Sequence, residues 1–81
     1  MKQYSAMDRF TTNAEALRLE RGFTKQALAD SIGMERSQLS NILSGKNSPT
    51  LETMERIATG LGVDVIDLLS TAARKKASQV A

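Results

Sequence analysis

The 81-residue chain contains neither cysteine nor histidine. Without cysteine it can form no disulfide bond, no thiolate metal site and no cysteine nucleophile. Without histidine it lacks the usual zinc ligand and the commonest general base near neutral pH, which excludes Ser-His-Asp catalysis. A small enzyme that uses carboxylates alone is the weak alternative, because no pair of acidic residues lies in an apolar setting that would shift a pKa. We therefore expect a binding protein that is not an enzyme and that carries neither a metal nor a cofactor.

Aromatic residues and long apolar runs are also scarce. Aromatic residues make up 4 % of the chain, so the core is expected to be aliphatic. No apolar run approaches the roughly 20 residues that span a membrane, and the N-terminus has no apolar signal region. A chain of 81 residues amounts to one small domain. These features predict a single cytoplasmic domain without a membrane partner.

The apolar residues recur with helical spacing, and no segment alternates with a period of two for long enough to predict a strand. The pattern predicts five short helices, over about residues 6–21, 25–32, 36–43, 51–61 and 65–69. The expected N-caps are Ser5, Thr24, Glu35, Thr50 and Asp64. The glycines expected to close the first four helices are Gly22, Gly33, Gly45 and Gly62. Residues 5–70 are thus expected to form one all-α domain, followed by a basic tail or helix extension over residues 71–81.

The segment Thr24–Leu43 has the most specific pattern. Its residue types suit two short helices that meet at a wide angle across a tight turn. Ala29 lies where the two helices would approach most closely, and Gly33 makes the turn. The apolar residues expected to fill the angle are Leu28, Ile32, Leu39 and Ile42.

This spacing resembles the helix-turn-helix of the phage repressor and Cro-type family, also called XRE-like. The resemblance continues in Arg18–Thr24, Leu43–Leu51 and Leu61–Leu69, and it covers about residues 8–70. It implies a compact five-helix repressor-like domain, in which the second and third helices form the helix-turn-helix. It also implies a sequence-specific transcriptional regulator, expected to be a repressor, that binds double-stranded DNA and is associated with the nucleoid.

The third predicted helix has an unusual polar face. With Leu39, Ile42 and Leu43 buried, the opposite face carries serine and asparagine side chains. These are poor helix formers, whereas short uncharged donors and acceptors suit contact with base edges. The alternative is an ordinary solvated surface. The family resemblance implies base contacts from Arg36, Ser37 and Asn41, with Gln38 as a secondary candidate for a base or a phosphate.

Candidate phosphate contacts flank this helix. The start of the second helix offers N–H groups and side chains to an anion, and the loop after the third helix offers a matching set. The candidates are Thr24, Lys25, Gln26, Lys46, Asn47 and Thr50, with Arg18 and Arg21 in addition. The alternative for each lysine or arginine is that its charge is simply solvated at the surface. The alternative for each threonine is that it caps its helix and makes no phosphate contact. Many family members have an acid in place of Leu43 that pairs with the arginine, so here Arg18 either reaches DNA or pairs with another acid such as Glu15.

The last predicted helix offers a candidate dimer interface. The family often dimerises through its closing helices, which implies a homodimer on a pseudo-palindromic operator. Val65, Ile66 and Leu69 supply more apolar surface than so short a helix buries alone. The alternative is that all three side chains cap the monomer's own core.

A protein-interaction module on the same fold, such as an antitoxin or an adaptor, is the alternative function. A basic protein partner would then face the acidic residues Glu52, Glu55, Asp64 and Asp67. Each of them also lies near the start of a predicted helix, where an acidic side chain stabilises the helix dipole, and this account is sufficient. The formal net charge of +2 does not distinguish a DNA partner from a protein partner, because residues 1–70 carry a net charge of −1 and residues 71–81 carry +3. The DNA hypothesis therefore rests on residue placement, and the basic tail is at most an auxiliary contact.

Overall fold

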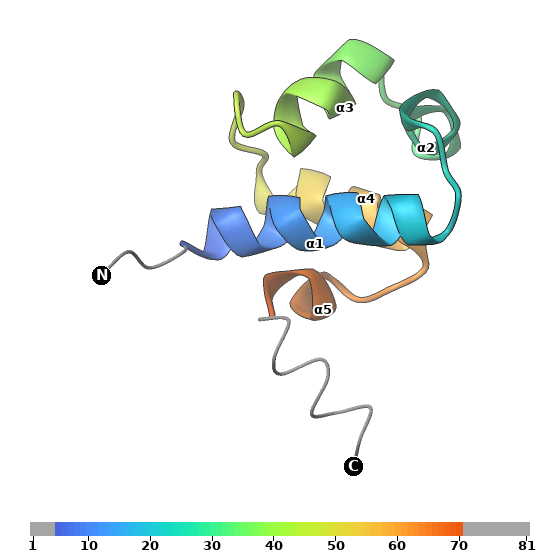
Figure 1. Cartoon of the computed structure of the whole chain (residues 1–81). Coiled ribbons are helices and arrows are strands. Elements are labelled where there is room, and N and C mark those ends of the chain that lie inside the picture. The colour runs from blue at the N-terminus through green and yellow to red at the C-terminus, as the bar shows by residue number, and fades with distance from the viewer. Residues whose placement is uncertain (1–4, 71–81) are drawn as a thin grey trace.

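A computed structural model describes residues 5–70, and the predicted basic tail or helix extension lies outside the described residues. Five helices and no strand occur in this part of the chain. They are α1 (Ala6–Glu20), α2 (Lys25–Ser31), α3 (Arg36–Leu43), α4 (Leu51–Leu61) and α5 (Val65–Leu69) (Figure 1). None of these described helices is both long and apolar enough to cross a membrane. The predicted all-α, five-helix fold is confirmed.

Side-chain caps begin four of the five helices, as the sequence predicts. At α1 the Ser5 hydroxyl accepts a hydrogen bond from the Asp8 N–H at 3.1 Å, and the Asp8 carboxylate accepts one from the Ser5 N–H at 3.2 Å. Thr24, Thr50 and Asp64 likewise accept a backbone N–H at the starts of α2, α4 and α5, and at α5 the Asp67 carboxylate completes a reciprocal pair. Glu35 occupies the N-cap position of α3 but makes no side-chain cap hydrogen bond. The first N–H groups of α3 are therefore left for water or a ligand.

The first four helices end in the same kind of turn. The predicted glycines follow them with positive φ, and they are Gly22, Gly33, Gly45 and Gly62. After α2, φ is +69° at Gly33, and the Met34 N–H donates to the Ala29 carbonyl at 2.9 Å across the turn. L side chains rarely adopt this conformation, so the tight connection between α2 and α3 depends on glycine.

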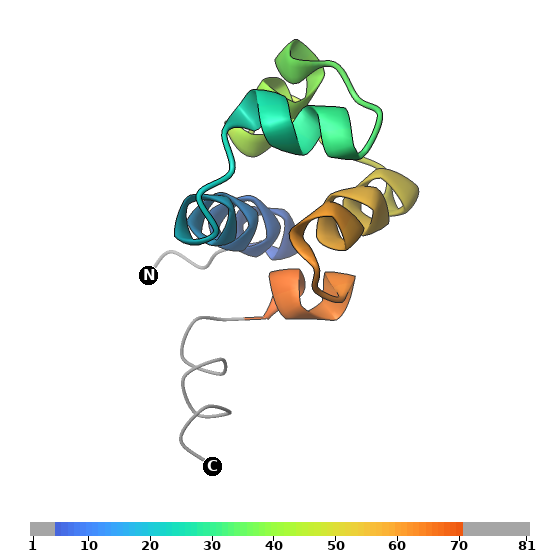
Figure 2. The ribbon, with the colours of Figure 1, turned by 90° about the vertical axis from the view of Figure 1, so that its right-hand side faces the viewer.

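The helices form three tiers (Figures 1 and 2). The pair α2 and α3 lies at one end of the molecule, α1 and α4 form the middle, and α5 packs against α1 and α4 at the opposite end. The largest fully buried side chains are Phe10, Leu28, Leu39, Ile57, Leu61 and Leu68. Apart from Phe10 the buried hydrophobic core is aliphatic, as expected from the composition. This core holds the α2–α3 pair on the middle tier.

Two side chains of α1 hold the end of α5. The Asn13 amide donates to the carbonyls of Leu68, at 2.9 Å, and of Ser70. The Arg9 Nε donates to the Leu69 carbonyl at 2.8 Å. These bonds satisfy carbonyls that the end of a helix leaves unpaired. They fix α5 to α1 although α5 is only five residues long.

Candidate nucleic-acid interface

The packing of α2 against α3 depends on a small set of buried residues. Leu28 and Ala29 on α2 and Leu39 on α3 have no exposed surface. Ile42 on α3 is 3 % exposed, and Ile32 packs against the same core just after α2. The predicted apolar angle of the helix-turn-helix is therefore present. Because this face of α3 is buried, its opposite face is turned outward.

The outer face of α3 carries polar side chains that find no partner in the described part of the chain. Arg36, Ser37 and Gln38 are exposed, and Asn41 is half-buried. Within residues 5–70 these four side chains form no hydrogen bond and no ion pair. The structure thus brings the predicted base-reading residues together on one short helix. No contact within the described part of the chain has to be broken before they meet a ligand.

The predicted phosphate contacts lie on two sides of α3. Helix α2 lies on one side of α3 and the loop over residues 44–50 on the other (Figure 1). The N–H groups of Lys46 and Asn47 both donate to the Asn41 carbonyl, at 2.9 and 3.2 Å. These bonds tie the loop to the end of α3, while the side chains of Lys46 and Asn47 stay exposed.

The start of α2 is capped and still offers a donor. The Thr24 hydroxyl accepts the Ala27 N–H at 3.0 Å. A hydroxyl also has a proton to donate, so capping and phosphate binding are compatible at Thr24. The Gln26 amide donates to the Asp30 carboxylate at 2.8 Å, so its side chain already has a partner within the helix. Lys25 is half-buried at the first position of the helix.

Thr50 and Leu51 lie at the start of α4, beside the loop. The Thr50 hydroxyl accepts the Thr53 N–H at 3.2 Å and donates to the Thr53 hydroxyl at 3.0 Å. A phosphate at Thr50 would therefore replace Thr53 as the acceptor. Leu51 is 57 % exposed, a feature that the sequence pattern did not predict.

Arg18 points into the protein and not toward a ligand. It is 8 % exposed, and its guanidinium donates to the Glu15 carboxylate and, at 2.7 Å, to the Phe23 carbonyl. The Arg18 hydrogen bond lowers the pKa of the Glu15 carboxyl, and the charge of Lys25 adds to this effect. Of the two alternatives for Arg18, the pair with Glu15 is the one present. With its nitrogens engaged, Arg18 is omitted from the proposed DNA contacts, whereas Arg21 is exposed.

The predicted dimer residues on α5 are of two kinds. Val65 and Leu69 are half-buried and pack against the core of the monomer. Ile66 is 61 % exposed. The monomer's own core thus accounts for part of the apolar surface of α5, and the Ile66 side chain stays on the surface of the monomer.

Two of the four acidic residues considered for a protein partner act as helix caps. The Asp64 carboxylate accepts the Ile66 N–H at 3.1 Å, and the Asp67 carboxylate accepts the Asp64 N–H at 3.3 Å. Glu52 lies in the first turn of α4, and Glu55 is exposed one turn further on. Helix stabilisation therefore accounts for most of this acidic set.

Two residues of α4 contact the helix-turn-helix although the sequence predicted no role for them. Arg56 donates hydrogen bonds to carbonyls of the turn, and Gly60 faces the end of α2. A glycine inside a helical pattern is a weak signal of close packing. An arginine among surface residues gives no comparable signal.

Comparison with known proteins agrees with this geometry. The family model described as Helix-turn-helix matches residues 15–68. The chain is 35 % identical over 60 residues to the HTH-type transcriptional regulator SutR of Escherichia coli (strain K12), and 33 % identical over 61 residues to the cryptic phage CTXphi transcriptional repressor RstR of Vibrio cholerae. These matches cover 74 % and 75 % of the chain, which spans 34 % of the length of SutR and 55 % of that of RstR. The crystal structure of the hypothetical transcription factor NHTF from Neisseria is similar with a TM-score of 0.83 and 21 % identity, over 93 % of this chain and 84 % of that one.

Proposed function

Because the chain belongs to the helix-turn-helix family, we propose that it is a sequence-specific DNA-binding transcriptional regulator. Family membership confirms the resemblance drawn from the motif over residues 24–43. The curated relatives SutR and RstR are transcriptional regulators and not enzymes, in agreement with the expectation from the composition. In this proposal residues 5–70 form the DNA-binding domain, and α3 lies in the major groove of double-stranded DNA.

The observation that carries the proposal is the polar face of α3, which has no hydrogen-bond partner among residues 5–70. Arg36 has the planar fork that suits the two acceptors of guanine, and Asn41 has the donor and acceptor that suit adenine. Ser37 is short enough to allow close approach and can donate or accept. Gln38 is exposed beside them and reaches a base or a phosphate. Because these side chains make no hydrogen bond within residues 5–70, their donors and acceptors are available for base edges.

Phosphate contacts hold α3 in register from both sides. The uncapped N–H groups at the start of α3 and the positive end of its dipole favour a nearby anion. Thr24 supplies a hydroxyl proton on one side, and Lys46 and Asn47 supply exposed donors on the other. The further proposed contacts are Lys25, Gln26, Thr50 and Arg21.

Two copies of the chain bind a pseudo-palindromic operator and repress transcription in this proposal. One recognition helix reads only a few base pairs, so two copies on half-sites about one turn (~34 Å) apart give the required specificity. The exposed Ile66 on α5 supports a contact between the copies. The name of the relative RstR, a transcriptional repressor, supports repression. Such a regulator acts in the cytoplasm, at the nucleoid.

Selection from random double-stranded DNA tests the proposal directly. We expect enrichment of a pseudo-palindromic sequence with two half-sites. Affinity for that sequence should fall steeply as salt rises, with a slope of log K against log salt of about −0.9 for each phosphate contact. A scrambled duplex of the same composition is the control. Failure to enrich any sequence, or binding that is independent of salt, would refute DNA recognition by this chain.

A further inference from the structure

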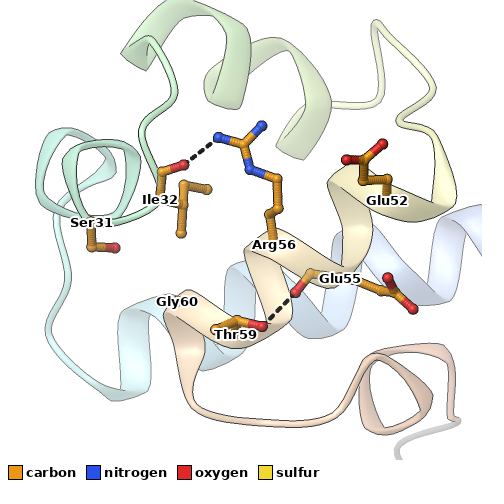
Figure 3. A pocket seen from close by; sticks show the side chains of 7 residues that line it. All are labelled: Ser31, Ile32, Glu52, Glu55, Arg56, Thr59 and Gly60. Carbon is orange, nitrogen blue, oxygen red and sulfur yellow. Dashed lines mark hydrogen bonds between the residues drawn. The ribbon is translucent and has the colours of Figure 1, made fainter.

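Arg56 of α4 holds the turn of the helix-turn-helix. Its guanidinium donates to the Ile32 carbonyl (Figure 3). It also donates to the Gly33 carbonyl at 3.3 Å. The same turn uses its own N–H groups to close on α2, for example from Met34 to the Ala29 carbonyl. The N–H groups of the turn are thus satisfied within the motif, whereas the carbonyls of Ile32 and Gly33 accept hydrogen bonds from α4.

Arg56 makes this contact although two carboxylates are near it on the same helix. Glu52 lies four residues earlier, at the spacing that favours an ion pair along a helix, and Glu55 is adjacent. Neither pairs with Arg56, and the one ion pair within residues 5–70 joins Arg18 to Glu15. Both hydrogen bonds to the turn come from one guanidinium nitrogen, Nη2, which carries two N–H groups. Arg56 therefore binds the carbonyls of the turn and not the carboxylates of Glu52 and Glu55.

A second contact of α4 lies one turn further along the helix, at Gly60. A Cβ atom placed on Gly60 would lie 2.5 Å from the Ile32 Cγ2 and 3.0 Å from the Leu28 Cδ1. The backbone of α4 therefore rests directly against the end of α2. Arg56 and Gly60 both line a surface groove of about 500 Å³ between these segments (Figure 3). Together they attach the turn to α4 at two points.

We propose that Arg56 is a positioning residue for DNA recognition, which acts through the turn and makes no contact with DNA. This inference rests on the proposed function. Arg36 and Ser37 lie only three and four residues after Gly33, so a shift of the turn moves the start of α3. Hydrogen bonds to base edges weaken within a few tenths of an ångström, whereas attraction to phosphates does not depend on such precise geometry. Loss of Arg56 should therefore weaken operator binding selectively.

Variants of Arg56 and one control test this inference. Arg56→Met removes the donors and keeps an apolar stem, and Arg56→Lys keeps a cation with less suitable geometry. Ser5→Ala is the control, because it removes the cap at the far end of α1 and lowers stability without touching the turn. Each protein is titrated with the selected operator and with unrelated duplex DNA at several salt concentrations, well below its melting temperature. Amide NMR shifts of the free proteins report on the turn.

We expect Arg56→Met to bind the operator about tenfold more weakly and unrelated DNA with unchanged affinity and salt slope. Amide shifts should change mainly over residues 30–38, Arg56→Lys should be intermediate, and Ser5→Ala should bind like the wild type. Unchanged operator affinity in Arg56→Met would overturn the inference. A salt slope reduced by about one would also overturn it, because it would indicate a direct phosphate contact. If the wild type shows no sequence preference, the proposed function fails, and unchanged amide shifts in Arg56→Met would refute the positioning role separately.

Discussion

The guanidinium of Arg18 reaches back one turn along α1 to the carboxylate of Glu15. It also donates forward to the carbonyl of Phe23, whose side chain packs against the core. The acid that pairs with Arg18 thus comes from its own helix and not from position 43, where this chain has leucine. One buried arginine thereby connects α1 to the segment that leads into α2.

The Glu15–Arg18 pair makes stability sensitive to acid. The Arg18 hydrogen bond holds the pKa of Glu15 below its ordinary value of 4.5, so the unfolded state binds this proton more readily than the folded state. The contribution is complete above pH 4.5 and is lost as the pH falls through the lowered pKa. Glu15→Gln should reduce the free energy of unfolding at about pH 7 by up to ~1 kcal/mol, and the difference from the wild type should shrink near pH 3. Urea unfolding at both pH values measures it, and a difference that does not change with pH would contradict this account.

Arg36 and Lys46 should differ in the kind of binding that they support. Arg36→Ala should cost about 1–3 kcal/mol of operator binding and relax the preference at one base pair. Lys46→Ala should weaken binding to all sequences alike and reduce the salt slope by about one. Competition with operators that carry single base changes separates the two effects. If Arg36→Ala left both affinity and base preference unchanged, the assignment of Arg36 to base reading would be wrong.

Gly60→Ala should destabilise the fold although alanine favours a helix more than glycine does. The helical preference gains about 0.5–1 kcal/mol, and overpacking against Ile32 and Leu28 costs about 1–3 kcal/mol. We expect a net loss of about 1 kcal/mol in the free energy of unfolding. Thr59→Ala, at the exposed neighbouring position, is the control and should be neutral or slightly stabilising. Thermal unfolding measures the difference. A rise in Tm for Gly60→Ala would contradict this prediction, because it would show that α2 moves to accommodate the added methyl group at little cost.

Ile66→Asp should dissociate the proposed homodimer and leave the monomer folded. The side chain is 61 % exposed, so the substitution removes an apolar contact between copies without opening the core. Leu19→Asp is the matched control, because Leu19 is 62 % exposed on α1, outside the proposed interface. Sedimentation at micromolar concentration should show dimers for the wild type and Leu19→Asp, and monomers for Ile66→Asp. A wild type that sediments as a monomer would exclude dimerisation through α5.

The features that could be predicted from the sequence are those that depend on neighbouring residues. The caps at Ser5, Thr24 and Asp64 and the turn at Gly33 involve residues within a few positions of one another. Helical periodicity then identified the buried face of α3, including Leu39. Local chemistry therefore predicts the helices, their order and the outward face of α3.

Contacts between distant segments could not be predicted in the same way. Arg56 is paired with the carbonyl of Ile32, and Asn13 with that of Leu68, across 24 and 55 residues. Main-chain carbonyls occur at every position, so no residue type in the sequence identifies which of them such a side chain will meet. The burial of Arg18 could not be predicted either. Its partners Glu15 and Phe23 are close in sequence, but the core that covers it is built from distant segments. The base and phosphate roles of the remaining site residues stay predictions.

The fixed position of Ser70 has a practical value for protein engineering. Because α1 holds the last carbonyls of α5, the chain leaves this domain at the end of the molecule opposite α3 (Figures 1 and 2). A fluorescent protein or an affinity tag joined after Ser70 would begin on the side farthest from the proposed DNA surface. A label joined before Ser5 would instead start on the middle tier, so the carboxyl-terminal junction is the preferred attachment point for binding assays.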